Sequence, residues 1–270
     1  MTVYKALTIA GSDSGGGAGI QADLKTFQEL GVYGMSAISA VTAQNTLGVH
    51  GVYPTPVEGV VEQINAIGDD LGTDAVKTGM LFSSDIIEAV SERIDHFNWK
   101  NLVIDSVMVA KGGAKLLQDE AVQALKEKLL PQAAVITPNL PEAEILTGSK
   151  IETIEDRKQA AKSIVEMGAK SVVMKGGHGK ERDVVDLFYD GTTFTEMISP
   201  RIDTNHTHGT GCTFSAAITA EIAKGKELLE AVETAKDFIR AAIENQLGIG
   251  NGHGPTNHWS YNQSKPGDHK

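Results

Sequence analysis

Short apolar segments alternate with longer amphipathic segments through about two thirds of this chain, and this alternation limits its fold more than any other feature. The apolar segments have the length of buried strands, and the segments between them carry apolar residues at helical spacing. The expected strands are Lys5 to Ala10, Tyr33 to Val41, Ala75 to Thr78, Leu102 to Val107, Ala133 to Thr137 and Ser171 to Met174. Strands that alternate with helices form a parallel sheet with helices on both faces, so the chain is predicted to have an α/β fold.

The alternation stops between Val184 and Ile198, where a different pattern begins. Two short apolar and aromatic segments, 187–189 and 192–194, flank Asp190-Gly191, a dipeptide typical of a type I′ hairpin turn. We therefore expect an antiparallel hairpin that extends the parallel sheet. Because no linker or internal repeat interrupts the chain, residues 1–259 are predicted to form one domain, followed by a polar tail at 260–270.

The composition excludes several classes of function. With 24 basic and 35 acidic residues, the chain has a formal net charge of −11 and lacks the basic face that non-specific nucleic-acid binding requires. Its single cysteine rules out an internal disulfide framework and a cysteine-rich zinc site. Residues 1–11 do not have the pattern of a signal peptide, and no apolar run has the length of a membrane span. We expect a cytoplasmic protein that binds neither nucleic acid nor membranes.

Glycines and polar side chains gather where the predicted strands end. In an open parallel sheet, the carboxyl ends of the strands form the edge at which ligands bind. Taken one at a time, these clusters are equally well explained by turns and helix caps, but their shared position favours a binding site. The clusters are 11–19, Gln44-Asn45, Gly79-Met80, Asp105, 139–142 and 175–178.

The first glycine cluster, 11–19, does not fit the two common nucleotide-binding motifs. It lacks the Gly-Lys-Ser/Thr of a P-loop, and its glycine spacing does not match the Gly-x-Gly-x-x-Gly of a dinucleotide fold. What remains is a turn at which backbone can approach a ligand closely. Asp23 follows among apolar residues, where a carboxylate needs a partner. A substrate amine or ring nitrogen would serve, although a position on the helix surface explains Asp23 as well.

A second cluster, His208-Gly209-Thr210-Gly211-Cys212, directly precedes a predicted helix. Small residues at a helix N-terminus leave backbone N–H groups that can hold an anion, such as a phosphoryl group during its transfer. Cys212 lies in the same positive field, which is expected to lower the pKa of its thiol. It is either a base or a small buried residue.

Asn139-Leu140-Pro141-Glu142 opens another predicted helix. Asparagine and glutamate oxygens can hold Mg²⁺, mostly through water and together with the phosphates of a substrate. The same two side chains also form a capping box, which needs no ligand. His206 and His208 lack the further ligands of a zinc site, and the neighbouring glycines favour phosphate instead.

Together these residues resemble the ribokinase superfamily, whose pattern is the Asn139 and Glu142 pair followed much later by a Gly-Thr-Gly turn. Most members have Asp after that turn. Cys212 instead matches the branch of hydroxymethylpyrimidine and phosphomethylpyrimidine kinases of thiamine biosynthesis and the related pyridoxal kinases. Ser106 departs from the branch, which often has Pro there, and we expect little effect beyond a softer backbone. The matching segments are 6–13, 16–27, 41–46, 77–80, 137–143, 174–178, 207–213 and 252–258.

The resemblance implies a three-layer α/β/α sandwich and an ATP- and Mg²⁺-dependent kinase. The enzyme would phosphorylate the hydroxymethyl group of 4-amino-5-hydroxymethyl-2-methylpyrimidine and then the resulting monophosphate. Its expected phosphoryl-transfer residues are Gly209, Thr210 and Gly211, with Cys212 as the base. The expected pyrimidine-binding residues are Gly11, Asp23, Gln44 and Met80. The nucleotide side would contain Asp105, Lys175, Asn139 and Glu142, the last two holding Mg²⁺ through water.

Two alternatives stay open. A pyridoxal, pyridoxine or pyridoxamine kinase of the same branch acts on a ring of similar size that also carries a hydroxymethyl group. Gln44 favours the aminopyrimidine, because its amide can pair with an amino group beside a ring nitrogen. The second alternative is a non-catalytic binding protein on the same fold. Members of this branch are commonly dimers.

Overall fold

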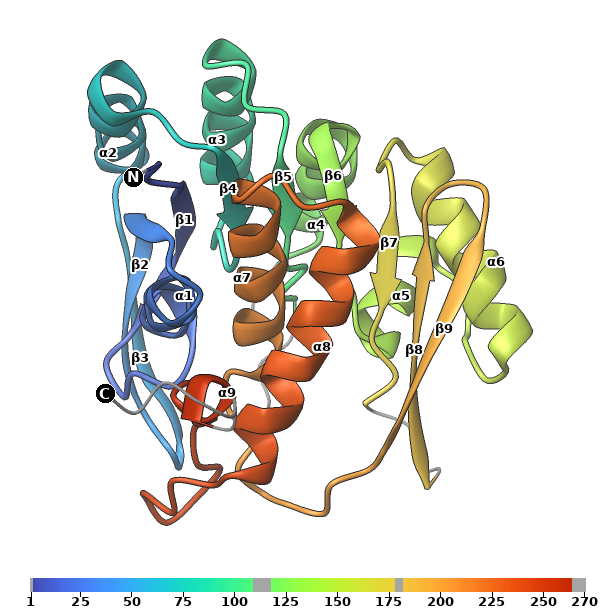
Figure 1. Ribbon diagram of the computed structural model, residues 1–270. Helices are drawn as coiled ribbons and strands as arrows, with labels where there is room; N and C mark the ends of the chain where they lie inside the picture. The colour runs from blue at the N-terminus through green and yellow to red at the C-terminus, as the bar shows by residue number, and fades with distance from the viewer. Residues whose placement is uncertain (1, 109–117, 178–181, 264–270) are drawn as a thin grey trace.

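Nine strands of the described residues lie in a single sheet, in the order β3-β2-β1-β4-β5-β6-β7-β8-β9 (Figure 1). This computed structural model describes residues 2–108, 118–177 and 182–263. The strands from β2 to β7 in this order are parallel, whereas β3 at one edge and β8 and β9 at the other are antiparallel to their neighbours. The strands are β1 (Lys5–Asp13), β2 (Tyr33–Asn45), β3 (Gly48–Pro54), β4 (Ala75–Thr78), β5 (Leu102–Ile104), β6 (Ala133–Ile136), β7 (Val172–Met174), β8 (Asp183–Tyr189) and β9 (Phe194–Pro200).

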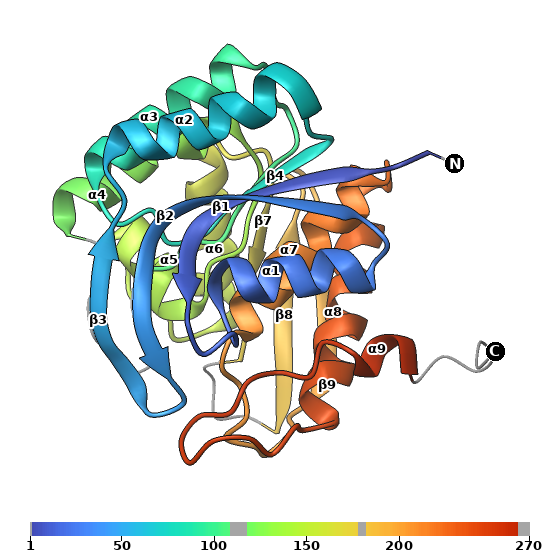
Figure 2. The ribbon, with the colours of Figure 1, turned by 90° about the vertical axis from the view of Figure 1, so that its left-hand side faces the viewer.

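Helices cover both faces of the sheet, which confirms the predicted three-layer α/β/α sandwich with a mostly parallel sheet (Figures 1 and 2). One face carries α1 (Gly19–Glu29), α7 (Thr210–Ala223) and α8 (Leu228–Glu244). The other carries α2 (Val57–Ala66), α3 (Ser84–His96), α4 (Asp119–Ala124), α5 (Leu140–Thr147) and α6 (Ile154–Glu166). Single helical turns at 67–71 and 125–129 continue α2 and α4, and a 3-10 turn at 130–132 leads into β6.

The strands bury both of their faces, as parallel strands between two helical layers must. In β5, Leu102 and Ile104 pack under α3 and α4, and Val103 between them faces α7 and α8. All three are at most 1% exposed. This burial on both sides explains why the central strands are uninterrupted apolar runs.

The structure corrects the prediction at both edges of the sheet. Strand β3 was not predicted, because Val49 and Tyr53 on it are 41% and 64% exposed and give no buried alternation. The predicted hairpin is present as β8 and β9, but Tyr189 pairs with Phe194, so its loop spans four residues, 190–193, and is not a two-residue type I′ turn. The Asp190 carboxylate accepts the N–H groups of Thr192 and Thr193 and stabilises this longer loop.

The predicted tail also begins later than expected. Residues Ser260–Gln263 form a short helix, α9, because Tyr261 packs its ring 5.1 Å from that of Phe238 on α8. Among the described residues, no helix combines the length and the apolar character that crossing a membrane requires.

The parallel strands bring the predicted clusters to one edge of the sheet. Asp13 ends β1, Gly79 follows β4, Asp105 follows β5, Asn139 follows β6 and Lys175 follows β7. Helix α7 begins at the same edge (Figure 2), where His208 and Gly209 lie against Gly17 of the first glycine loop. The fold therefore places glycine loops and polar side chains around one opening.

Candidate active site

A cavity of about 740 Å³ opens at the carboxyl edge of the parallel strands. Its volume is that of a small-molecule site. It is lined by every residue of the predicted site except Asp23, namely Gly11, Gln44, Met80, Asp105, Asn139, Glu142, Lys175, Gly209, Thr210, Gly211 and Cys212. The structure thus brings together side chains that lie far apart in the sequence.

The start of α7 is packed tightly against the first glycine loop. Gly209, the N-cap residue, has φ 84°, and a Cβ atom built on it would lie 1.7 Å from the carbonyl oxygen of Gly17. A Cβ atom on Gly211 would lie 3.3 Å from Lys175 Nζ and 3.7 Å from Asp105 Oδ1. The N-terminus of the helix, with the positive end of its dipole, therefore lies next to the ammonium group of Lys175. This is a surrounding suited to an anionic group.

Asp23, which was predicted to bind the substrate ring, does not line the cavity and is paired with Lys77 instead. Its carboxylate has no exposed surface and accepts two hydrogen bonds from Lys77 Nζ, at 2.8 and 2.9 Å. Thr8 Oγ1 donates a third, at 2.6 Å. Burial raises the pKa of Asp23, and these bonds act against that shift. The carboxylate does have the partner that its apolar surroundings require, but the partner is Lys77 and not the substrate.

Lys77 lines the cavity but was not among the residues predicted for the site. It is fully buried within β4. Burial acts to lower the pKa of its ammonium group, but the surrounding negative charges, that of Asp23 first, together with its hydrogen bond to Asp23 outweigh burial and raise the pKa, so Lys77 stays charged. A lysine inside a four-residue buried strand was the signal that could have identified it.

Asp105 joins two cations at the floor of the cavity. Its Oδ1 lies 3.3 Å from Lys175 Nζ, and its Oδ2 lies 4.0 Å from Lys77 Nζ. Although Asp105 is only 2% exposed, Oδ2 has no hydrogen-bond partner. A buried carboxylate oxygen without a partner is an acceptor available to a ligand or to a hydrated cation.

The environment of Cys212 differs from the prediction. The helix N-terminus was expected to lower the pKa of the thiol, but burial raises it to about 12. The charge of Lys77 and a hydrogen bond from the N–H of Gly19 act in the opposite direction without overcoming burial. At neutral pH the thiol is therefore protonated in the ligand-free protein.

Asn139 and Glu142 form a capping box at the start of α5. Asn139 Oδ1 accepts the N–H of Glu142, and Glu142 Oε2 accepts the N–H of Asn139, both at 2.9 Å. Burial raises the pKa of Glu142, while Lys175 acts to lower it. Ser106 Oγ also donates to Glu142 Oε2, at 3.1 Å. Ser106 therefore contributes a contact at the site, beyond the softer backbone that was expected of it.

These oxygens fit a hydrated magnesium ion better than a metal held by protein alone. In the part of the chain that the structure describes, no three His, Cys, Asp or Glu side chains are grouped closely enough to hold a metal. Asp105 Oδ2 without a partner and the buried carboxylate of Glu142 nevertheless lie near Lys175, on the nucleotide side of the predicted site. Mg²⁺ usually keeps several waters and takes its other ligands from phosphates, which is compatible with this arrangement.

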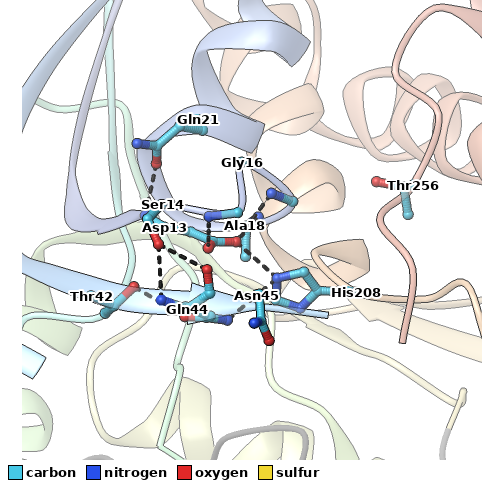
Figure 3. Close-up of polar contacts among 12 residues, drawn as sticks. Asp13, Ser14, Gly16, Ala18, Gln21, Thr42, Gln44, Asn45, His208 and Thr256 are labelled. Carbon is cyan, nitrogen blue, oxygen red and sulfur yellow. Dashed lines mark hydrogen bonds and ion pairs between the residues drawn. The ribbon is translucent and has the colours of Figure 1, made fainter. Parts of the chain in front are cut away.

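The side of the cavity formed by Gly11, Met80 and Gln44 carries fewer charges than the side formed by Asp105, Glu142 and Lys175. Gly11 and Met80 face each other, because a Cβ atom on Gly11 would lie 2.7 Å from Met80 Cε. Gln44, near the end of β2, has its amide Oε1 3.1 Å from Thr42 Oγ1 and its Nε2 3.4 Å from His208 Nε2 (Figure 3). A thioether and an amide are suited to the face and the polar edge of an aromatic ring.

Comparison with known proteins identifies the family. The phosphomethylpyrimidine kinase family matches residues 13–257. A hydroxymethylpyrimidine/phosphomethylpyrimidine kinase of Bacillus subtilis (strain 168) is 59% identical over 265 residues, 98% of each chain. A pyridoxine kinase of the same organism is 51% identical over 262 residues, 96% of this chain and 97% of its own. The structure of the pyridoxal kinase from Staphylococcus aureus in complex with AMP-PCP and pyridoxal has a TM-score of 0.90 at 41% identity, covering 98% of this chain and 97% of that chain. The predicted resemblance is confirmed, and the chain belongs to the phosphomethylpyrimidine kinase family.

Proposed function

We propose that this chain is an ATP-dependent kinase that phosphorylates the hydroxymethyl group of 4-amino-5-hydroxymethyl-2-methylpyrimidine and then the resulting monophosphate. One observation carries the proposal: a single cavity joins the α7 N-terminus and Cys212 to Gln44 and Met80. An anion-binding turn thus lies in the same space as groups suited to an aromatic ring. The relatives named hydroxymethylpyrimidine/phosphomethylpyrimidine kinase support the same substrates.

In the first reaction, the hydroxyl oxygen of the pyrimidine forms a bond to the γ-phosphorus of ATP. The bond from that phosphorus to the bridging oxygen breaks, ADP leaves, and the hydroxyl proton is released. In the second reaction, a phosphate oxygen of the monophosphate attacks in the same way. Phosphoryl transfer depends mainly on positioning and on charge stabilisation. The N–H groups of Gly209, Thr210 and Gly211 would hold the transferred phosphoryl oxygens, with Lys175 beside them.

Magnesium, held through water by Asn139 and Glu142, would neutralise charge on the phosphates when bound. Asp105 would support that side through its Oδ2. We assign the proton of the hydroxyl group to Cys212, which requires its thiolate form. Lys77 and the N–H of Gly19 favour this form, and burial opposes it. The thiolate is therefore a minor species, and positioning supplies the larger part of the rate.

On the ring side, Gln44 is placed to pair with the amino group and the neighbouring ring nitrogen, and Met80 to contact the ring face. Gly11 leaves room for Met80, since any side chain there would meet Met80 Cε. Asp23 supports the site only indirectly, by holding Lys77.

A vitamin B6 kinase is the second candidate, favoured by the pyridoxine kinase relative and by the pyridoxal complex of the Staphylococcus aureus structure. A panel of acceptors with ATP and Mg²⁺ separates the two: the aminopyrimidine, its monophosphate, pyridoxal and pyridoxine. We expect the highest kcat/KM with the pyrimidines. Phosphorylation of pyridoxal alone would support the second candidate, and the absence of acceptor-dependent ATP consumption would indicate a binding protein.

A further inference from the structure

The ring of His208 connects the two loops that form the mouth of the cavity. His208 Nε2 lies 2.8 Å from Asp13 Oδ2, at the end of β1, and 3.4 Å from Gln44 Nε2, near the end of β2. Figure 3 shows the imidazole beside both side chains. The histidine immediately precedes the Gly-Thr-Gly turn of α7. One side chain thus contacts the glycine loop and the amide assigned to the substrate ring.

Asp13 determines that the ring nitrogen at this contact, Nε2 of His208, carries a hydrogen. Its carboxylate accepts the N–H of Gly15 on Oδ1 and those of Gly17 and Ala18 on Oδ2, at 2.8 to 3.0 Å. Burial acts to raise the pKa of Asp13, but the bond from His208 and these backbone bonds lower it below its ordinary value. An ionised carboxylate only accepts hydrogen bonds, so His208 Nε2 must bear a hydrogen and donate it.

The hydrogen on His208 Nε2 determines which atom of the Gln44 amide, oxygen or nitrogen, can face the imidazole. An amide N–H group directed at an Nε2 that itself carries hydrogen is unfavourable, because two donors meet. The oxygen and nitrogen of the amide have nearly the same shape, so a half-turn exchanges them without moving other atoms. After the exchange, the amide oxygen faces the single N–H of His208 Nε2 and shares it, as the more distant acceptor, with Asp13 Oδ2. The amide NH₂ then donates to Thr42 Oγ1, whose own hydrogen goes to the carbonyl oxygen of Ser12 at 2.9 Å.

We propose that His208 is a positioning residue which, anchored by Asp13, holds the Gln44 amide with its oxygen toward the imidazole and thereby sets selectivity for the aminopyrimidine. This inference rests on the proposed function for the identity of the ring. With one orientation fixed, the remaining donor and acceptor of the amide occupy fixed positions at the cavity. An amide free to turn would accept either an aminopyrimidine or a pyridine ring. A fixed polar group rejects a ring that leaves it unpaired.

The backbone of His208 is held independently of its ring. Its N–H donates to the carbonyl oxygen of Gly254 at 3.0 Å, and its carbonyl oxygen accepts the N–H of Thr256 at 3.2 Å. Replacement of the side chain should therefore leave the turn before α7 in place. Glutamine can put an amide NH₂ where the imidazole has Nε2, whereas leucine fills space without a donor. His208→Gln is thus the conservative variant and His208→Leu the disruptive one.

His258 offers a matched control. Its Nε2 lies 3.0 Å from Thr213 Oγ1 on the same helix, but its ring does not line the cavity. His258→Leu perturbs packing at the start of α7 without touching Gln44. Any general effect of losing a histidine there should appear equally in His258→Leu.

The test compares kcat/KM for the aminopyrimidine with kcat/KM for pyridoxal in the wild type and the three variants. We expect His208→Leu to lower the ratio of the two about tenfold, and His208→Gln and His258→Leu to leave it within about threefold. In parallel, long-range proton–nitrogen NMR of the ¹⁵N-histidine-labelled full chain should show hydrogen on Nε2 of His208. The His208→Gln sample assigns that signal.

Two results would overturn the inference: an unchanged ratio in His208→Leu, or a neutral His208 with its hydrogen on Nδ1 alone. A wild type that phosphorylates pyridoxal but not the pyrimidine would contradict the proposed function instead. In that case the NMR measurement still decides the orientation of the contact.

Discussion

Replacing Asp23 with asparagine tests whether the buried ion pair with Lys77 is structural. Neither side chain has exposed surface, and the Asp23→Asn variant would leave the Lys77 ammonium group with Asp105, 4.0 Å away, as its nearest anionic partner. Removing one member of a buried ion pair typically costs about 3–5 kcal/mol, because the other charge stays buried without compensation. The hydrogen bond from Thr8 survives in Asp23→Asn, since an amide oxygen still accepts it. We therefore expect a decrease of about 3 kcal/mol in the free energy of unfolding, at the lower end of that range.

The assay is equilibrium unfolding in urea, together with binding of the aminopyrimidine under conditions in which the variant is fully folded. Because Asp23 does not line the cavity, the dissociation constant should change by less than about threefold. The double variant Asp23→Leu/Lys77→Met is the control, since an apolar pair of similar volume removes both charges and should recover much of the lost stability. A variant with normal stability and binding weakened tenfold or more would refute this reasoning and restore Asp23 as a ring ligand.

Three further predictions concern the cavity. In Cys212→Ala, kcat should fall by about 10²–10⁴-fold while substrate affinity stays within a few fold, and the wild-type rate should rise with pH, because a thiol with a pKa of about 12 gains thiolate as pH increases. Cys212→Asp should give a flat profile above pH 6, whereas a near-native rate in Cys212→Ala would assign the thiol to packing alone. Glu142→Gln should raise the Mg²⁺ concentration needed for half-maximal turnover, and an unaltered dependence would leave Glu142 with its capping role only. Gln44→Ala should weaken pyrimidine binding by about one to two orders of magnitude in calorimetry, and unchanged affinity would remove Gln44 from the site.

The central strands and most residues of the cavity could be predicted from the sequence, because both leave a pattern within short segments of the chain. A parallel strand buried on both faces must be apolar throughout, and its carboxyl end must carry whatever binds a ligand. Strand β3 was missed because its apolar residues Val49 and Tyr53 are exposed and leave no buried pattern to detect.

The two errors at the site arise from contacts between distant parts of the chain. Asp23 and Lys77 are 54 residues apart and meet only because β4 lies beside β1, under α1. Cys212 has the helix N-terminus that predicts a lowered thiol pKa, but the burial that raises it depends on the packing of the surrounding segments. Periodicity and motif spacing carry no information about either contact.

The close approach of Gly209 to Gly17 limits how this protein can be recombined with its relatives. A Cβ atom on Gly209 would meet the carbonyl oxygen of Gly17, and a Cβ atom on Gly17 would lie 2.4 Å from His208 Cδ2, so neither position has room for a side chain. The two segments must therefore come from the same parent protein, or from parents of the same local structure, although they are separated by most of the chain. A chimera that takes residues 1–100 from one relative and 101–270 from another joins loops that were shaped in different proteins. Such chimeras should retain activity only when both parents share the same backbone path at 13–19 and 207–212.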